Sequence, residues 1–422
     1  MKHVFVGFGF GPIQSGLFAK EAYSGGRFSE IAVAEVDPAL VAAVRGNNDC
    51  YTLNVAAANG VEQVQVEGVK LLDPAQPDDE RRLNDALSRA TEIVTSLPSV
   101  AFFARGGTAS VAGRIAAGLC GAAGQTIVYT AENNNHAAEI LEKDVRNAVP
   151  QGARPRAAQY LNTVIGKMSQ VINDPDEIAR RGLTPVAPGF PRAFLVESFN
   201  RILVSKITLP GFEPGITAFE EKADLLPFEE AKLYGHNAIH TLLGFLAQDS
   251  RLSLMSDLRG RPDLLGLARK AFIDESGAAL VRRYRNHGDA LFTEAGFRAY
   301  AEDLLERMTN PHLADTVARA TRDPVRKLGR TDRIFGAIRL CMEYGMEPLN
   351  LAAGALAGLR ALAEDKECPA SPAFEALRSG RKLDADALAQ CLTAIWGDAC
   401  AADELRDIAD LLQRASALPH RS

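Results

Sequence analysis

The sequence predicts an α/β domain built on a parallel sheet, followed by an all-helical domain. Short apolar, β-branched runs alternate with helical segments in the first half of the chain, and a glycine-rich turn joins the first run to the first helix. Long segments with 3.6-residue periodicity dominate the second half. We therefore expect two domains, at residues 1–218 and 219–422.

The elements of the first domain follow in strand–helix order. Residues 3–9 predict a buried strand, 12–26 a helix, 30–37 a second strand and 38–46 a second helix. Further elements are expected as strands at 64–72, 92–97, 125–132 and 193–206, and as helices at 82–90 and 111–123. Residues 183–192 contain three prolines and predict a loop.

The second domain is predicted to be helical because the β-branched runs fade after residue 218. Its clearest helical segments are 231–247, 296–308, 333–345 and 402–415.

Bulk composition limits the classes of partner. Hydrophobic residues make up 47% and charged residues 24% of the 422 residues, which is typical of globular proteins. The net charge of −6 disfavours a general affinity for nucleic acid or acidic membrane surfaces. No apolar stretch is long enough to span a membrane, and six scattered cysteines without C-x-x-C spacing favour buried thiols over disulfides or a zinc site. We expect a cytoplasmic protein.

The glycine-rich turn predicts a dinucleotide site. Its glycines are Gly7, Gly9 and Gly11. Glycines allow a tight turn and let a pyrophosphate approach the helix N-terminus, where the N–H groups of Ile13 and Gln14 point outward. Pro12 replaces the third glycine of G-x-G-x-x-G, and proline is tolerated as a first helical residue. Similar turns also occur in plain strand–helix connections.

Acidic residues at the end of the second strand strengthen this prediction. Glu35 stands where an acid would bind the adenosine ribose hydroxyls, which favours NAD over NADP. Alternatively, Glu35 and Asp37 only cap the next helix, and Asp37 fits such a cap because it precedes Pro38. Turn, strand and acid together in one βαβ unit predict nucleotide binding.

The segment 231–247, AKLYGHNAIHTLLGFLA, predicts an amphipathic helix with an unusual polar side. At about 100° per residue, Lys232, His236, Asn237 and His240 fall within about 140° of one another. A metal site at the two histidines lacks both the glutamate of H-E-x-x-H and a third ligand. A solvated helical face is the other alternative.

Four motifs resemble those of the polyol-specific long-chain dehydrogenases, the mannitol dehydrogenase family. KLYGHNAIH is similar to its K-x-x-x-x-N-x-x-H signature, and AEN at 131–133 to its acid–Asn motif. Residues 307–328 resemble its R-[FM]-x-N-P-x-L-x-D-T segment, and 328–345 the helix that follows. The likeness extends to about residue 350 and is closest to the mannitol-1-phosphate 5-dehydrogenase branch. It implies a Rossmann-type NAD-binding domain, a helical substrate domain and no catalytic metal.

The resemblance also implies roles for individual residues. Lys232 is the candidate general base, provided that burial and neighbouring positive charge lower its pKa. Asn237 and Asn133 are expected to donate hydrogen bonds to the developing carbonyl oxygen, and His240 to bind a substrate hydroxyl. His236 has no assigned counterpart and is interpreted as packing.

Other contacts remain open between a functional and a structural interpretation. Ser96 and Ser99 follow a strand and either contact the nicotinamide or form a plain loop. Glu229 or Glu230 either relays protons or only begins the helix, and Asn134 or Asn135 could share the role of Asn133.

A basic run suits a sugar phosphate or, alternatively, a solvated face. The run comprises Arg322, Arg326, Lys327, Arg330 and Arg333. We expect Arg326 and Arg333 to contact the substrate. The family commonly has an Asp-Arg pair where this chain has Gly166 and Lys167, which leaves the substrate open.

These features predict an NAD-dependent oxidoreductase that interconverts a polyol or polyol phosphate and the corresponding ketose, most simply mannitol 1-phosphate and fructose 6-phosphate. An unphosphorylated hexitol dehydrogenase, a hexuronate reductase and a non-catalytic NAD(H)-binding homologue are the alternatives. A monomer or homodimer is expected.

Overall fold

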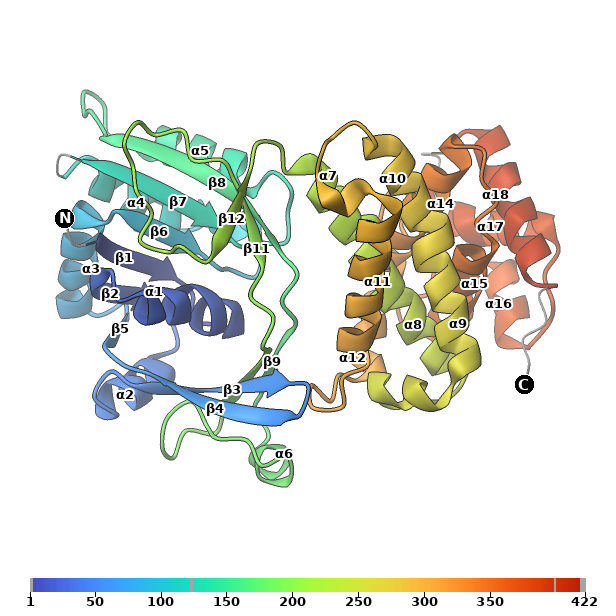
Figure 1. The fold of residues 1–422 in the computed structure, drawn as a ribbon, viewed down its shortest axis with the longest axis horizontal. Coiled ribbons are helices and arrows are strands. Elements are labelled where there is room, and N and C mark those ends of the chain that lie inside the picture. Colours follow the sequence, from blue (N-terminus) through green and yellow to red (C-terminus); the bar gives the residue numbers. More distant parts are fainter. Residues whose placement is uncertain (1–2, 122–123, 398–399, 418–422) are drawn as a thin grey trace. The chain divides into compact units, whose positions relative to one another are not determined.

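The computed structural model describes residues 3–121, 124–397 and 400–417, and the chain folds into two compact units (Figure 1). The N-terminal unit comprises Met1–Leu226 and the C-terminal unit Pro227–Ser422. The sheet of the N-terminal unit includes a strand at Phe219–Lys222, so this unit continues beyond residue 218.

An eight-stranded sheet forms the centre of the N-terminal unit, in the order β12-β11-β8-β7-β6-β1-β2-β5. Its strands are β1 (His3–Phe8), β2 (Phe28–Ala34), β5 (Val69–Leu72), β6 (Glu92–Thr95), β7 (Gln125–Thr130), β8 (Ala157–Ile165), β11 (Ile202–Ser205) and β12 (Phe219–Lys222). Neighbouring strands are parallel except β8 and β11. The strand order reverses at β1, and ligands of such sheets bind at the carboxyl ends beside this point.

Helices cover both faces of this sheet (Figure 1). On one face, α3 (Pro77–Arg89), α4 (Val111–Leu119) and α5 (Ala137–Ala148) contribute side chains to the same apolar cluster as Val4 and Val6 of β1. On the other face, η1 (Gln14–Ala19), α1 (Lys20–Gly25) and α2 (Pro38–Gly46) pack near Phe5. Strands buried on both faces have nearly continuous apolar sequences, which explains why β1 is recognisable. The predicted α/β class is confirmed.

A second sheet, in the order β4-β3-β10-β9, was not foreseen. It consists of β3 (Tyr51–Ala57), β4 (Gly60–Val66), β9 (Ser169–Ile172) and β10 (Ala193–Glu197), and α6 (Pro175–Arg180) follows β9. The single strand expected at 64–72 is wrong, because Gly68 turns the chain with a φ of +69° between β4 and β5. The strand expected at 193–206 also divides, into β10 and β11.

One predicted helix and one predicted strand need boundary changes. The helix expected at 111–123 ends at Leu119, and residues 122–123 lie outside the described residues. The strand expected at 92–97 ends at Thr95, and short 3₁₀ turns follow at η2 (Val100–Phe102) and η3 (Gly107–Ala109).

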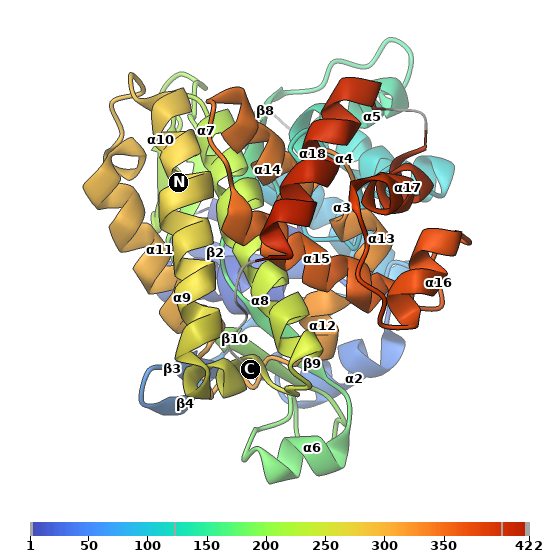
Figure 2. The ribbon, with the colours of Figure 1, turned by 90° about the vertical axis from the view of Figure 1, so that its right-hand side faces the viewer.

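The C-terminal unit is built from helices, as predicted. They are α7 (Leu226–Glu230), η4 (Ala231–Asn237), α8 (Ala238–Asp249), η5 (Met255–Gly260), α9 (Pro262–Lys270), η6 (Ala271–Gly277), α10 (Ala278–Tyr284), η7 (Ala290–Phe292), α11 (Glu294–Met308), α12 (Val317–Thr321), α13 (Pro324–Lys327), α14 (Arg333–Glu343), α15 (Leu349–Ala363), α16 (Pro372–Arg378), α17 (Ala385–Trp396) and α18 (Ala402–Ala415). Helices α8 and α15 pack closely (Figure 2). Glycine at position 354 permits this approach, since a Cβ there would lie 2.4 Å from Leu242.

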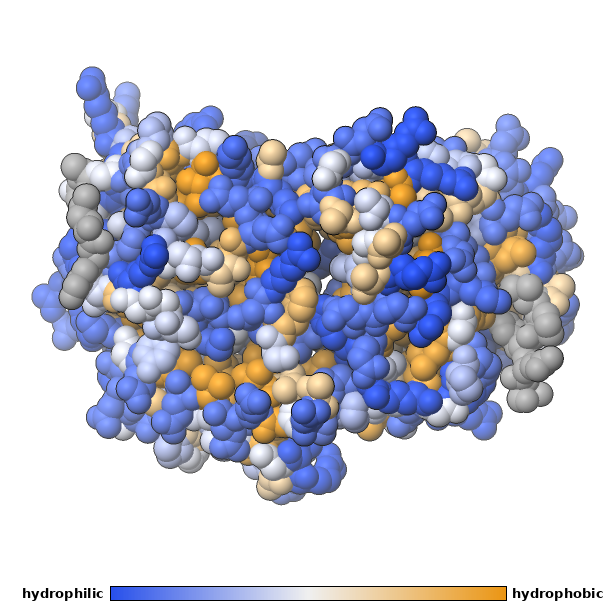
Figure 3. All heavy atoms as spheres, viewed as in Figure 1, coloured by the Kyte–Doolittle hydropathy of each residue, from blue (hydrophilic) through white to orange (hydrophobic). Residues whose placement is uncertain are grey.

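The surface is mostly hydrophilic on the face shown in Figure 3, with apolar side chains in small groups. Within residues 3–121, 124–397 and 400–417, no helix has the length and apolar character needed to cross a membrane. All six cysteines lie in these ranges as free thiols, but only Cys341 and Cys391 are buried, so the expectation of buried thiols holds for these two alone.

Candidate functional site

The glycine turn of the N-terminal unit is shaped by close contacts. Gly9 has a φ of +80°, and a Cβ there would lie 2.7 Å from the carbonyl oxygen of Ser96. A Cβ at Gly7 would lie 1.7 Å from Nε2 of Gln14, whose side chain is buried. By contrast, a Cβ at Gly11 would have no neighbour within 4 Å. This space at the start of a helix, beside Ile13, is suited to a phosphate group.

Glu35 lies at the carboxyl end of β2 and is tied to the glycine turn. Its Oε2 accepts a hydrogen bond from the N–H of Phe10 at 2.7 Å, and its Oε1 from the N–H of Asp37 at 2.8 Å. A carboxylate has further lone pairs, so both bonds leave it able to accept from ribose hydroxyls. Asp37 caps α2 by accepting from the N–H groups of Ala39 and Leu40, as its alternative interpretation predicted.

The ends of β6 and β7 are held together by Glu132, the acid of the acid–Asn motif, to which the sequence interpretation gave no role. Its buried carboxylate accepts from the hydroxyl of Thr95 at 2.9 Å and from the N–H of Leu97 at 2.8 Å. Burial raises the pKa of Glu132, and these two hydrogen bonds oppose the rise. Glu132 therefore fixes the chain on either side, at Ser96 and at the exposed Asn133.

Three other polar residues near this edge have local structural roles. Ser99 caps η2 by accepting from the N–H of Ala101 at 3.3 Å, and Oδ1 of Asn134 accepts from the N–H of His136 at 2.8 Å. Lys167 is buried, and its ammonium donates to the carbonyl oxygen of Phe199 and to Oδ1 of Asn200, both at 2.8 Å. Lys167 thus fixes the connection between β10 and β11.

The lysine segment differs from the expected α-helix in one respect. Residues Ala231–Asn237 form a π-helical stretch, η4, which continues directly into α8. Hydrogen bonds in a π-helix join residues i and i+5, which is the separation of Lys232 and Asn237. The π-helical stretch therefore brings these two side chains closer to one side of the helix than an α-helix would.

Lys232 lies in an environment that disfavours its charge. The pKa of Lys232 is lowered from 10.5 to about 8. Burial is the largest cause and the charge of Arg333 the second, while Glu229 opposes the change. Glu230, by contrast, accepts hydrogen bonds from Nη1 of Arg283 at 3.0 Å and from the hydroxyl of Tyr284 at 2.6 Å. Of the two glutamates, Glu229 is the one that acts electrostatically on the lysine.

The two histidines of the segment differ in their surroundings. His236 is buried, and burial together with the charges of His240 and Arg307 holds its pKa well below the usual value. His236 is therefore a neutral packing residue at physiological pH. Nε2 of His240 forms a hydrogen bond with Oδ2 of Asp315, and the two atoms are 2.8 Å apart.

The basic run separates into buried and exposed members. Lys327 and Arg333 are buried, with Nζ of Lys327 donating to the carbonyl oxygen of Ala320 at 2.8 Å. Burial lowers the pKa of Lys327 to about 7, followed by the charges of Arg333 and Arg326. Arg326 is half exposed and lies 3.5 Å from Asp323. Sequence reasoning placed Lys327 in the run but did not select it, because burial depends on the tertiary fold.

The C-terminal helices support this basic segment. The indole N–H of Trp396 donates to the carbonyl oxygen of Leu328 at 2.8 Å, and the Trp396 ring packs edge-on against Phe335. Glu404 of α18 accepts from Nη2 of Arg330 at 2.5 Å and also pairs with Arg339. Arg330 is thereby engaged in structure.

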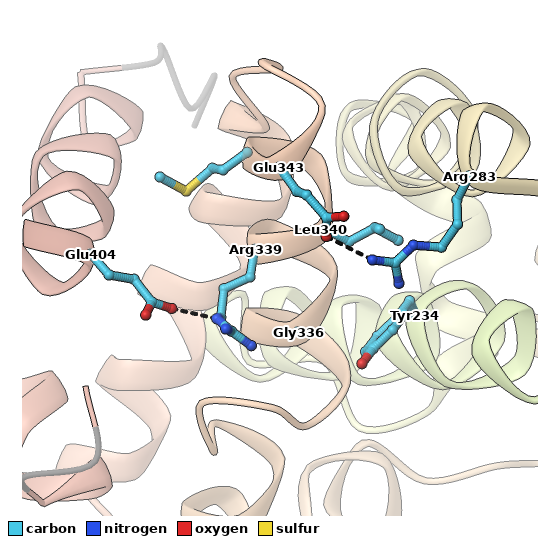
Figure 4. Close-up of a pocket in the computed structure, with 8 residues that line it drawn as sticks. Tyr234, Arg283, Gly336, Arg339, Leu340, Glu343 and Glu404 are labelled. Carbon is cyan, nitrogen blue, oxygen red and sulfur yellow. Dashed lines mark hydrogen bonds and ion pairs between the residues drawn. The ribbon is translucent and has the colours of Figure 1, made fainter. Parts of the chain in front are cut away.

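A cavity of about 310 Å³ lies beside η4 (Figure 4). Tyr234 lines it. Tyr234 is two positions after Lys232, and this spacing places the two side chains on roughly opposite sides of a helix. Figure 4 shows that its arginines already pair with carboxylates, Arg283 with Glu343 and Arg339 with Glu404. These neutralised charges make the cavity an unsuitable anion site.

Comparisons with known proteins agree with this arrangement. Residues 224–398 match the family model described as the mannitol dehydrogenase C-terminal domain. A mannitol-1-phosphate 5-dehydrogenase of Brevibacillus brevis is 26% identical over 362 residues, 84% of this chain and 85% of the relative. One from Pseudarthrobacter chlorophenolicus is 30% identical over 262 residues, 62% of each chain.

Two solved structures share the fold. A substrate-free D-sorbitol dehydrogenase has a TM-score of 0.75 at 15% identity, over 98% of this chain and 93% of the other. The Pseudomonas fluorescens mannitol 2-dehydrogenase, in a complex with NAD and D-mannitol, has a TM-score of 0.66 at 15% identity, over 98% and 92% of the two chains. Both matches span the α/β unit and the helical unit.

Proposed function

Because the chain belongs to the mannitol dehydrogenase family, we propose that it is an NAD-dependent polyol dehydrogenase. Two relatives named mannitol-1-phosphate 5-dehydrogenase favour mannitol 1-phosphate and fructose 6-phosphate as the substrate pair. The observation that carries the proposal is Lys232, a lysine with a pKa of about 8 on the same helix as Asn237 and His240.

The residues of the N-terminal unit fit the cofactor. The open space at Gly11 and the adjacent helix start would hold the pyrophosphate, and Glu35 would accept the ribose hydroxyls. The side chain of Val36, which is 81% exposed beside Glu35, offers an apolar contact for the adenine. Ser96 lies at the end of β6 near the glycine turn and would contact the nicotinamide side. Bound NAD would supply the acceptor for the hydride that leaves the carbinol carbon.

Lys232 is the proposed general base. A lysine with a pKa of about 8 is partly neutral at physiological pH, so it can take the hydroxyl proton during oxidation and return it during reduction. Glu229 is the proposed proton acceptor from Lys232, because it is the acid that acts on the lysine's charge.

Amide and imidazole groups complete the chemistry. The carboxamide of Asn237 would donate to the substrate oxygen as carbonyl character develops, without competing for the proton. The sequence motif gives Asn133 the same role, and His240 would hold a second hydroxyl. In this proposal no metal takes part, because neutral and cationic donors polarise the oxygen.

The buried cations support a phosphorylated substrate. Burial and the charge of Arg333 lower the pKa of Lys327, and a phosphate dianion would relieve the repulsion between these two cations. Arg326 would add to the attraction from the edge of the site. An unphosphorylated hexitol or a hexuronate remains the alternative substrate class, since Lys167 in place of the family's arginine has a structural role.

The test is NADH absorbance with purified protein offered fructose 6-phosphate, free fructose and a hexuronate in parallel. We expect NADH to be consumed with the phosphate ester. Consumption with fructose or the hexuronate alone would support the alternatives. Binding of NADH without turnover would support a non-catalytic homologue. Lys232→Ala should abolish turnover and keep NADH affinity. Lys270→Ala, at an exposed position of α9, is the matched control and should keep full activity.

A further inference from the structure

Asp315 forms a buried pair with His240 for which the family motifs give no reason. Nε2 of His240 lies 2.8 Å from Oδ2 of Asp315, and Asp315 is only 2% exposed. The second oxygen, Oδ1, accepts from Nε of Arg319 at 2.6 Å. Each oxygen of the carboxylate therefore has its own donor.

The backbone around Asp315 is fixed on both sides. The N–H of Met255 donates to the carbonyl oxygen of Asp315 at 2.8 Å, and Leu254 forms a β-bridge with Thr316. The hydroxyl of Thr316 accepts from the N–H of Arg319 at 3.2 Å and begins α12. The carboxylate is thus held in place independently of the histidine.

The charge state of Asp315 determines which nitrogen of the histidine carries the proton. Burial favours the neutral acid, but the hydrogen bonds from His240 and Arg319 outweigh it and hold the pKa of Asp315 well below its usual range. An ionised carboxylate can only accept hydrogen bonds, so Nε2 must carry a proton. In the neutral ring, Nδ1 is then the acceptor nitrogen.

We propose that Asp315 is a positioning residue, which holds the His240 ring through Nε2–H and presents Nδ1 as the acceptor for one hydroxyl of the substrate. The inference rests on the proposed function in one respect, namely that His240 contacts the polyol. Its content is an orientation and a tautomer, and both can be measured without any substrate.

The first experiment is ¹⁵N NMR of the full chain labelled at histidine, with His240→Ala used to assign the signal. We expect Nε2 protonated and Nδ1 bare in the wild-type protein. In Asp315→Asn one of the two carboxylate oxygens becomes an NH₂ group, so the remaining oxygen can face either His240 or Arg319. Arg319 is cationic and therefore the stronger donor, so the oxygen should face Arg319. The NH₂ group then faces His240, and we expect the Nδ1–H tautomer. An unchanged tautomer would overturn the inference.

The second experiment is a double-mutant cycle on kcat/KM with the substrate that supports turnover. Asp315→Asn should lower kcat/KM about 10- to 100-fold, mainly through a higher KM. A decrease of this size corresponds to the loss of one hydrogen bond to the substrate. In a His240→Ala background the same substitution should change kcat/KM less than about twofold. Additive losses would overturn the inference, because Asp315 would then act by another route.

A matched variant separates orientation from stability. Asp79 is also buried, 3% exposed, and accepts from Nη2 of Arg45 at 2.6 Å, but it lies in the N-terminal unit. Asp79→Asn should lower the melting temperature without altering the tautomer of His240. If the tautomer changes in Asp315→Asn while His240→Ala keeps full kcat/KM, the inference fails through its premise, and the proposed substrate role of His240 fails with it.

Discussion

The charge of Arg333 provides a direct test of the proposed base. In the proposed mechanism oxidation requires neutral Lys232, so kcat/KM for the polyol should rise with pH through the pKa of this lysine, about 8. Arg333 stabilises the neutral amine by repulsion of the ammonium. Substituting Arg333→Gln removes this charge, the pKa of Lys232 rises, and the acid limb of the profile moves to higher pH.

The size of this displacement follows from the causes of the lowered pKa. The pKa of Lys232 falls from 10.5 to about 8, burial is the largest cause, and Arg333 is the second. Removal of Arg333 therefore reverses only part of the lowering, and we expect the limb to move by about 0.5 to 1 pH unit, or roughly 0.7 to 1.4 kcal/mol.

The assay is the pH dependence of kcat/KM for polyol oxidation at saturating NAD, above pH 7, where a substrate phosphate is already a dianion. Arg339→Gln is the control, because Arg339 lies on the same helix but pairs with Glu404. A limb that stays in place in Arg333→Gln, or moves as far in Arg339→Gln, would refute the assignment of Lys232 as the titrating base.

Three further predictions follow from individual contacts. Gly9→Ala should lower the free energy of unfolding by about 1 to 3 kcal/mol and should also weaken NADH binding, because the residue has a positive φ and faces the Ser96 carbonyl. Gly11→Ala should keep the melting temperature and weaken only NADH binding, as measured by a fluorescence titration. Lys327→Met should stabilise the protein most below pH 7 and progressively less towards pH 10.5, because the lowered pKa of Lys327 makes its ammonium costly in the folded state, as thermal melts across this range would show. Glu132→Gln should cost about 1 to 3 kcal/mol in urea unfolding, because the amide NH₂ cannot accept from Thr95 or Leu97, and an unchanged midpoint would contradict the role assigned to Glu132.

Local patterns were sufficient to predict the fold class, whereas the candidate site residues came from motifs that resemble those of a known family. β1 is apolar along its length because both faces are covered, and the alternation with helices follows from parallel connections. The second sheet was missed because apolar residues recur on both sides of Gly68, so β4 and β5 read as one strand, whereas the positive φ of Gly68 separates them. The π-helical stretch at Ala231–Asn237 was also missed, because an extra residue in a helical turn leaves the apolar periodicity almost unchanged.

Residues that act through distant partners could not be found from the sequence. Asp315 meets His240 across 75 positions, and the motif that contains Asp315 gives no sign of this contact. Lys327 and Arg326 are adjacent in the basic run, yet only Lys327 is buried. Composition predicts the sign of the charge on this segment, whereas the fold determines which cation loses water and changes its pKa.

The shared dependence of two lysines on Arg333 links substrate charge to the base. Burial and the charge of Arg333 lower the pKa of Lys327 to about 7 and that of Lys232 to about 8. A bound phosphate dianion would instead keep Lys327 protonated, so binding near neutral pH would take up a proton. If both proposals hold, the phosphate contact and the base are electrostatically coupled through Arg333, because a phosphate beside this arginine would offset the charge that lowers the pKa of Lys232.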